Sequence, residues 1–374
     1  MIGPESGANL PEAAQAEFPM RGLAKELSKQ EFAETAERTL REYGVASILT
    51  FYRTIREGRG KEILGTVSER GSETEIGLES NTEHMFVNMC NANQLPVFII
   101  GEHHSYKSPQ TNGIEPKHIA LFDALDDTRE YEQGGQGQQG LPAPLWTAGS
   151  IYSLEGNPVV GIIVNMKEKK MYVSANGKNS LVDLETNEEK EIKPSERTSI
   201  KDKGFCLATY LGEPKYALSF FKNFSEVEEA LMEADNDAVN QPHTGSFIYG
   251  PMAEGNVDAY LIAREPISEQ LPGWAFAQVA GFTAWEINPK DGSYKEIKHD
   301  LNSFKENPSE YRKGRMPVYL VTRSDQVRDE IIALIVKGHK KQEFQKIKDL
   351  FISTRTEEFE IFRASRKSQD SSGN

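Results

Sequence analysis

Hydrophobic and polar positions follow two periodicities in the first third of the chain. Between residues 26 and 56, apolar residues recur near the spacing of one helix face, which predicts an amphipathic helix. A second helix is expected at about 81–92, followed by an apolar run at 97–100 that predicts a buried strand. A similar run at 119–122 predicts another strand, and acidic residues follow it directly. This part of the chain therefore mixes helices with buried strands.

Beyond residue 145, alternating positions predict several further strands, broken by turns at Gly156-Asn157 and at 167–169. The expected strands are 150–154, 159–165, 171–174, 207–210, 259–262 and 318–322. The expected helices are 225–234, 275–285 and 326–337, and the charged stretch 180–203 is expected to be a loop excursion. Strands and helices mixed throughout the chain predict an α/β (α+β) protein built from layers of helix and sheet.

Changes in composition suggest a division of the chain into four parts. Residues 1–25, rich in Gly and Pro, are expected to be a flexible leader, and 338–374 a charged and partly disordered tail. Between them we expect an N-terminal α+β half at 26–145 and a C-terminal α/β half at 146–337.

Composition and charge exclude several classes of function. Hydrophobic residues make up 37% of the chain and charged residues 27%, which is ordinary for a globular protein. The net charge of −14 argues against binding to nucleic-acid polymers or anionic membranes. There is no apolar run long enough to span a membrane and no readable secretory signal, so the expectation is a soluble cytoplasmic protein. Cys90 and Cys206 show no metal-ligand spacing and are expected to be reduced.

Acidic residues follow two of the apolar runs directly. Glu102 comes after the run at 97–100, and the segment Asp123-Ala-Leu-Asp-Asp-Thr128 ends the run at 119–122. Strand ends often carry functional groups, because the sheet fixes their positions. Carboxylates that converge there, together with an exposed carbonyl, form the all-oxygen shell that Mg²⁺ prefers. Taken alone, however, Asp126, Asp127 and Thr128 also fit the capped start of a solvated helix.

Three short segments in the N-terminal half occur in an order that resembles one family. A helix start at Leu78-Glu79 is followed by Gly101-Glu102 and then by Asp123-Ala-Leu-Asp-Asp-Thr128. Their order and spacing resemble the inositol monophosphatase superfamily, whose members carry Gly-Glu-Glu and Asp-Pro-(Ile/Leu)-Asp-Gly-Thr at two strand ends. The resemblance implies a layered α-β-α-β-α sandwich of the inositol monophosphatase and fructose bisphosphatase type.

The C-terminal half continues the resemblance. Gly245-Ser246 is similar to the family's Gly-(Ser/Thr) turn, and Ala253-Glu-Gly-Asn-Val-Asp-Ala-Tyr260 to its "AxGxxDAY" strand. The segment Gly273-Trp-Ala-Phe-Ala-Gln-Val-Ala-Gly281 resembles the family's Trp-Asp-x-Ala-Ala-Gly helix. The run after Thr128 is closer to the bisphosphate nucleotidase branch, which acts on 3′(2′),5′-bisphosphate nucleotides. The matching segments span about residues 30–337.

By this resemblance, the protein is a Mg²⁺-dependent phosphomonoesterase of a small phosphorylated metabolite, with Mn²⁺ as an alternative metal and a homodimer among the expectations. Paired Mg²⁺ ions in such a site neutralise the phosphate and align the attacking water. The implied metal ligands are Glu102, Asp123, the Leu125 carbonyl and Asp126. Glu79 and Thr128 are the implied catalytic pair, which orients and deprotonates the water. The implied substrate-binding residues are Asp127, Thr128, Gly245 and Ser246.

Departures from the family pattern fall on this same set of positions. Ala275 stands where the family has a metal-binding aspartate, and its methyl group cannot coordinate a cation. Asp127 replaces a glycine at the phosphate-binding helix start, where a carboxylate would compete with phosphate for the backbone N–H groups. An alternative function is therefore a catalytically impaired or inactive relative that uses the fold for binding or assembly.

Overall fold

The computed structural model describes residues 27–56, 63–66, 74–101, 105–107, 115–126, 145–210, 214–234, 236–240, 245–263 and 265–340 of the 374-residue chain. The N-terminal half holds helices α1 (Lys29–Arg56) and α2 (Gly77–Ala92) and a short hairpin of strands β1 (Ile63–Thr66) and β2 (Thr74–Ile76). Helix α1 begins with a capping box, because the Glu31 N–H donates to the Ser28 hydroxyl and the Glu31 carboxylate accepts from the Ser28 N–H.

Within the described residues, the larger sheet has eight strands in the order β10-β9-β8-β7-β6-β5-β3-β4. Only the β3–β5 pair is parallel, and every other neighbouring pair is antiparallel. The strands are β3 (Val97–Ile100), β4 (Ser105–Lys107), β5 (His118–Asp126), β6 (Trp146–Ser153), β7 (Pro158–Asn165), β8 (Lys170–Ala175), β9 (Lys178–Asp183) and β10 (Glu188–Ile192).

The smaller sheet has six strands in the described part of the chain, in the order β12-β11-β13-β16-β14-β15. Its central strand pair, β13 with β16, is antiparallel, whereas β11 runs parallel to both β12 and β13. The strands are β11 (Cys206–Tyr210), β12 (Asp237–Asn240), β13 (Ala259–Ala263), β14 (Thr283–Ile287), β15 (Tyr294–Glu296) and β16 (Val318–Thr322).

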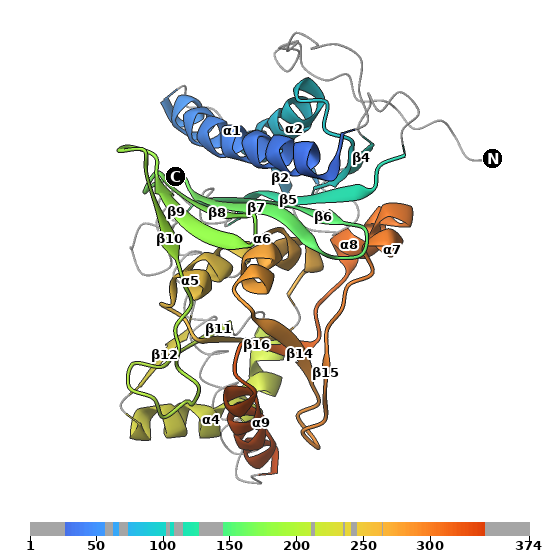
Figure 1. The fold of residues 1–374 in the computed structure, drawn as a ribbon. Helices are drawn as coiled ribbons and strands as arrows, with labels where there is room; N and C mark the ends of the chain where they lie inside the picture. The colour runs from blue at the N-terminus through green and yellow to red at the C-terminus, as the bar shows by residue number, and fades with distance from the viewer. Residues whose placement is uncertain are drawn as a thin grey trace, which may run out of the picture.

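Helices cover both sheets and fill the space between them (Figure 1). Helices α1 and α2 lie on the outer face of the larger sheet, and α5 (Tyr249–Glu254) and α6 (Ile267–Val279) lie between the two sheets. The 3₁₀ turn η2 (Ser246–Ile248) leads into α5. Helices α4 (Pro214–Glu233) and α9 (Asp325–Lys340) pack on the outer face of the smaller sheet. Helices α7 (Leu301–Glu306) and α8 (Pro308–Lys313) lie beside α6, and their apolar side chains share a cluster with residues of β3, β5 and β6 in the larger sheet.

Apolar side chains pack between each pair of layers. Leu40 of α1, Phe86 of α2 and Phe122 of β5 belong to the cluster on the outer face of the larger sheet. Tyr260 of β13 and Phe276 of α6 belong to the cluster between the sheets. These interfaces establish the layered α-β-α-β-α arrangement, so the predicted fold class is confirmed. No helix in the described ranges has the length and apolarity needed to cross a membrane.

Two secondary-structure predictions were wrong. The stretch 180–203 contains most of the β9–β10 hairpin. Its charged residues are compatible with a strand because β10 lies at the edge of the sheet, where its first four side chains are exposed to solvent. The predicted helix at 275–285 is instead the end of α6 followed by β14. Helix α6 starts at Ile267 and continues through Pro272, where contacts from other elements replace the helical hydrogen bonds that proline removes.

Candidate functional site

A β-bulge interrupts β5 within the acidic segment. Asp123 pairs with Ala148 of β6, whereas Asp126 pairs with Trp146, so two residues of β5 lie opposite a single residue of β6. In a regular strand, positions three apart face opposite sides of the sheet. One inserted residue reverses this relation. The backbone register therefore assigns positions 123 and 126 to the same face, at the carboxyl end of β5.

Hydroxyl groups from two other elements hold the bulge. Thr147, the residue opposite the bulge, donates a hydrogen bond from Oγ1 to the Asp123 carbonyl over 2.8 Å. The Tyr43 hydroxyl of α1 lies 2.7 Å from the same Oγ1. Because the single Thr147 hydroxyl proton goes to Asp123, Tyr43 must be the donor in the second bond. This chain of hydroxyls connects α1, β6 and β5 and fixes the backbone at Asp123.

Three acidic side chains are buried in this part of the fold. Glu79, Glu83 and Asp123 are 2%, 1% and 1% exposed. Burial raises the pKa of the Tyr43 hydroxyl, and the charges of Asp123 and Glu83 raise it further. Both carboxylates therefore lie close enough to Tyr43 to act on it electrostatically. Glu79 lies one turn before Glu83 on α2, near the helix N-terminus.

Glu83 had no assigned role in the sequence analysis, although its spacing of four residues from Glu79 places both on one helix face. The structure packs Glu83 against the end of β3. A Cβ atom added at Gly101 would lie 2.1 Å from Glu83 Oε1 and 2.7 Å from the Phe122 ring. Gly101 therefore lets a carboxylate and an aromatic ring approach the strand end immediately before Glu102.

Several predicted site residues lie outside the described part of the chain. Glu102, Asp127 and Thr128 are among them, and of Asp126 only the backbone is described. The Leu125 side chain is buried in the core beneath α1 and α2, so its carbonyl is the group that could act as a ligand. Among the described residues, no group of three or more His, Cys, Asp or Glu side chains is arranged to hold a metal ion.

Ala275 of α6 is fully buried and faces the larger sheet. A Cβ atom added at Gly161 of β7 would lie 3.0 Å from the Ala275 Cβ and 2.7 Å from the Ser150 hydroxyl. Ser150 pairs with both Gly161 and Leu121, two residues before Asp123 on β5. Ala275 therefore fills the space left by Gly161, two strands across the sheet from β5 and in the row of Leu121, two residues before Asp123.

Gly245 and Ser246 form the start of η2 and contact α6. Gly245 has a φ of 124°, a conformation that favours glycine. The Ser246 hydroxyl donates to the Glu269 carbonyl over 2.8 Å and accepts from the Gly273 N–H over 2.9 Å. Its hydroxyl is therefore used within the protein. The next residue, Phe247, stacks on Trp146 with ring centroids 5.4 Å apart, beside the register position of Asp126.

Comparison with solved structures identifies the fold. The extragenic suppressor protein suhB from Bartonella henselae superposes with a TM-score of 0.53 at 14% identity, covering 82% of this chain and 97% of that chain. An IMPase from Thermotoga maritima superposes with a TM-score of 0.52 at 11% identity, covering 82% of this chain and 96% of that chain. An inositol monophosphatase from Anabaena superposes with a TM-score of 0.51 at 14% identity, again covering 82% of this chain and 96% of that chain.

By sequence, no protein-family model and no curated protein matches this chain. The chain therefore has the fold of inositol monophosphatases, at a sequence identity of 11–14% to these three structures.

Proposed function

We propose that this protein is a Mg²⁺-dependent phosphomonoesterase that acts on a small phosphorylated metabolite, at the carboxyl end of β5. The bulge in β5 is the observation that carries the proposal, because its register assigns positions 123 and 126 to one face of the sheet. Two acidic positions that share one face at a strand end are a suitable start for a hard-cation site. The likeness in fold to inositol monophosphatases adds support.

The chemistry of the described donors fits a divalent cation. The buried carboxylate of Asp123 and the carbonyl of Leu125 are hard oxygen donors. Glu79 and Asp123 are both buried, and a cation beside them would stabilise their ionised forms. Glu102 and Asp126 would complete the ligand set. When bound, Mg²⁺ would neutralise the phosphate and activate a water molecule.

In this proposal the protein's own groups divide the work of binding and proton transfer. Glu79, near the start of α2, would accept the proton of the attacking water together with Thr128. Thr147 and Tyr43 would keep the Asp123 backbone in place through their hydrogen bonds. Gly245 and Ser246 would position α6 next to the site, since the Ser246 hydroxyl bonds to that helix. The substrate class we propose is an inositol phosphate or a 3′(2′),5′-bisphosphate nucleotide.

A second candidate function is binding or assembly without turnover. It is favoured by Ala275, which supplies no ligand and is packed against Gly161. A site without this anionic ligand would bind the metal less tightly, because the charge of the ligands sets cation affinity.

Phosphate release from a substrate panel separates the two functions. The purified full chain would be incubated with inositol monophosphate or adenosine 3′,5′-bisphosphate and Mg²⁺ or Mn²⁺. We expect turnover that is lost in Asp123→Asn, while Asp291→Asn, which changes an exposed turn, stays like wild type. Ala275→Asp should raise the rate if a ligand is missing. No turnover by wild type or by Ala275→Asp, with no Mg²⁺ binding in calorimetry, would overturn the first function and favour the second.

A further inference from the structure

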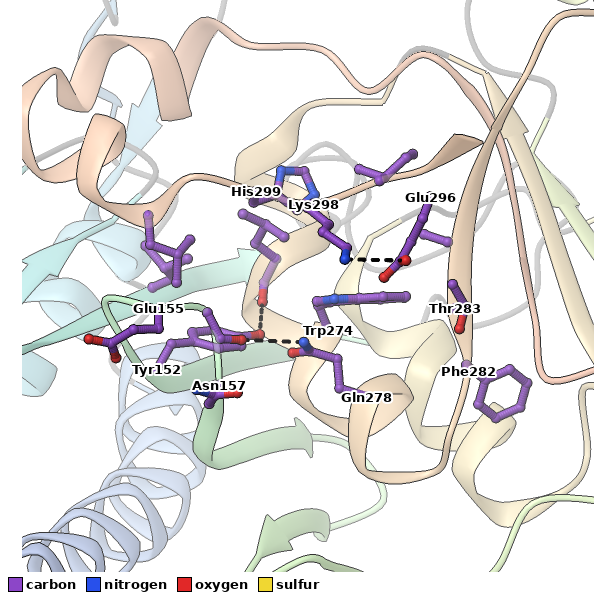
Figure 2. Close-up of a pocket in the computed structure, with 16 residues that line it drawn as sticks. Tyr152, Glu155, Asn157, Trp274, Gln278, Phe282, Thr283, Glu296, Lys298 and His299 are labelled. Atoms are coloured by element: carbon purple, nitrogen blue, oxygen red, sulfur yellow. Dashed lines mark hydrogen bonds and ion pairs between the residues drawn. The ribbon is translucent and has the colours of Figure 1, made fainter. Parts of the chain in front are cut away.

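A cavity of about 300 Å³ lies at the opposite end of β5 from the acidic segment (Figure 2). It opens between the C-terminal half of α6, the turn after β6 and the segment that follows β15. Leu121 contributes to its lining, as does Tyr152, whose neighbour Ser153 pairs with the first residue of β5. The volume is at the lower end of the range for small-molecule sites, roughly 300–1,000 Å³. None of the lining residues belongs to the site proposed above, although Leu121 lies two positions before Asp123 on β5.

Gln278, in the wall of this cavity, carries a buried hydrogen-bond acceptor. Its Nε2 donates to the Gly156 carbonyl over 3.3 Å, which sets the orientation of the amide. Its Oε1 is buried, and no hydrogen-bond partner for it exists among the described residues. A buried carbonyl without a donor is unfavourable. A ligand whose N–H reaches this oxygen, after a small movement of the side chains that cover it, would therefore gain affinity.

Aromatic rings provide the apolar part of the cavity. Trp274 lies at its centre in Figure 2, with Phe282 and Tyr152 to either side. Tyr249 packs edge-on against Trp274, with ring centroids 5.5 Å apart, and holds the indole in place. An indole is the strongest aromatic partner for a cation in proteins.

The charges around the cavity favour a cation over an anion. Glu155 and Glu296 contribute two carboxylates, and Lys298 contributes one ammonium group. Lys298 pairs with Glu296 over 3.5 Å, and both side chains are largely exposed, so the pair is weak. Burial lowers the pKa of His299 to about 4, so His299 is neutral at pH 7. The lining therefore has a net charge of about −1 at neutral pH.

We propose that this cavity is a binding site for a small organic ammonium compound. The ligand's N–H would donate to Gln278 Oε1, its charge would be compensated by Glu296, and its apolar body would lie against Trp274. Lys298 would compete with the ligand for Glu296, because both are ammonium groups.

The test is a titration of the full chain with phenethylammonium chloride, followed by calorimetry and tryptophan fluorescence. We expect one site per chain with a dissociation constant below about 1 mM. Gln278→Met should weaken binding about tenfold or more, because it removes a hydrogen bond to a charged donor. Glu296→Gln should weaken it and Lys298→Met should strengthen it, each by a few-fold.

Matched controls lie outside the cavity. Gln326→Met changes an exposed amide on α9, and Lys295→Met removes a lysine that pairs with Glu286 over 2.9 Å. Neither should alter binding. Phenylacetate, which has the same ring and the opposite charge, should not bind. Absence of phenethylammonium binding, equal binding of phenylacetate, or an affinity unchanged in both Gln278→Met and Glu296→Gln would each overturn the proposal.

Discussion

The hydroxyl of Ser246 lies between the Gly273 N–H and the Glu269 carbonyl, two groups that would bond directly in a regular helix. The Ser246 hydroxyl accepts a hydrogen bond from the Gly273 N–H over 2.9 Å and donates one to the Glu269 carbonyl over 2.8 Å. The inserted side chain opens the hydrogen-bond ladder of α6 at Pro272-Gly273. It also joins η2 to the helix that carries Ala275.

Other hydroxyls satisfy the neighbouring carbonyls of α6. Pro272 has no N–H to give to the Ser268 carbonyl, which instead accepts from the Tyr311 hydroxyl over 3.3 Å. The Tyr152 hydroxyl donates to the Leu271 carbonyl over 2.7 Å, and the Ser150 hydroxyl to the Pro272 carbonyl. The proline is tolerated because surrounding elements supply the donors.

Ser246→Ala should destabilise the protein by about 1–3 kcal/mol, because it leaves a buried N–H and a buried carbonyl without the bridging hydroxyl. Urea denaturation would measure the loss. Ser293→Ala, which removes an exposed hydroxyl that bonds Asp291, serves as the control and should cost little. An unchanged unfolding free energy in Ser246→Ala would mean that the Gly273 N–H bonds directly to the Glu269 carbonyl in the variant.

Gly101→Ala should destabilise the protein by about 1–3 kcal/mol, because the new methyl group would overlap Glu83 and the Phe122 ring. The matched control is Gly149→Ala on β6, where an added Cβ would meet its nearest neighbour at an ordinary 3.5 Å. Thermal unfolding of both variants tests the difference. Equal melting temperatures would show that Glu83 can move away from the strand end.

Thr147→Val keeps the size of the side chain but removes its hydrogen bonds to Asp123 and Tyr43. We expect a loss of about 1–3 kcal/mol, since the Tyr43 hydroxyl is left buried without its acceptor. Any Mg²⁺-dependent phosphate release should fall as well, because the bulge loses its support. In Tyr43→Phe the Thr147–Asp123 bond remains, so activity should fall less than in Thr147→Val. The opposite order would contradict a role for Thr147 in holding the bulge.

Acid should destabilise the fold through His299. Burial lowers its pKa from 6.5 to about 4, so between these pH values the folded state binds fewer protons than the unfolded chain. Protonation of His299 in the unfolded chain therefore does not affect the free energy of unfolding above pH 6.5, and it lowers that free energy as the pH falls toward 4. NMR titration of the imidazole carbons measures this pKa directly. His118, stacked on Phe32, should also titrate below 6.5 because of burial. A His299 pKa near 6.5 would refute the expectation.

Local sequence patterns determined much of the secondary structure and, through the order of short motifs, the fold class. The apolar runs at 97–100 and 119–122 form strands, because continuous apolar segments require burial on both faces of a sheet. The amphipathic spacing at 26–56 forms α1, whose apolar face covers that sheet. These features depend on neighbours within a few residues along the chain.

Only the tertiary structure decided the geometry of the acidic segment and of α6. No local pattern indicates the bulge that assigns positions 123 and 126 to one face, because it depends on pairing with β6 and on the Thr147 hydroxyl. Helix α6 passes through Pro272 because hydroxyls from β6, η2 and α8 supply hydrogen bonds to its carbonyls. Such bonds join residues far apart in sequence, and periodicity reports only on residues that are close.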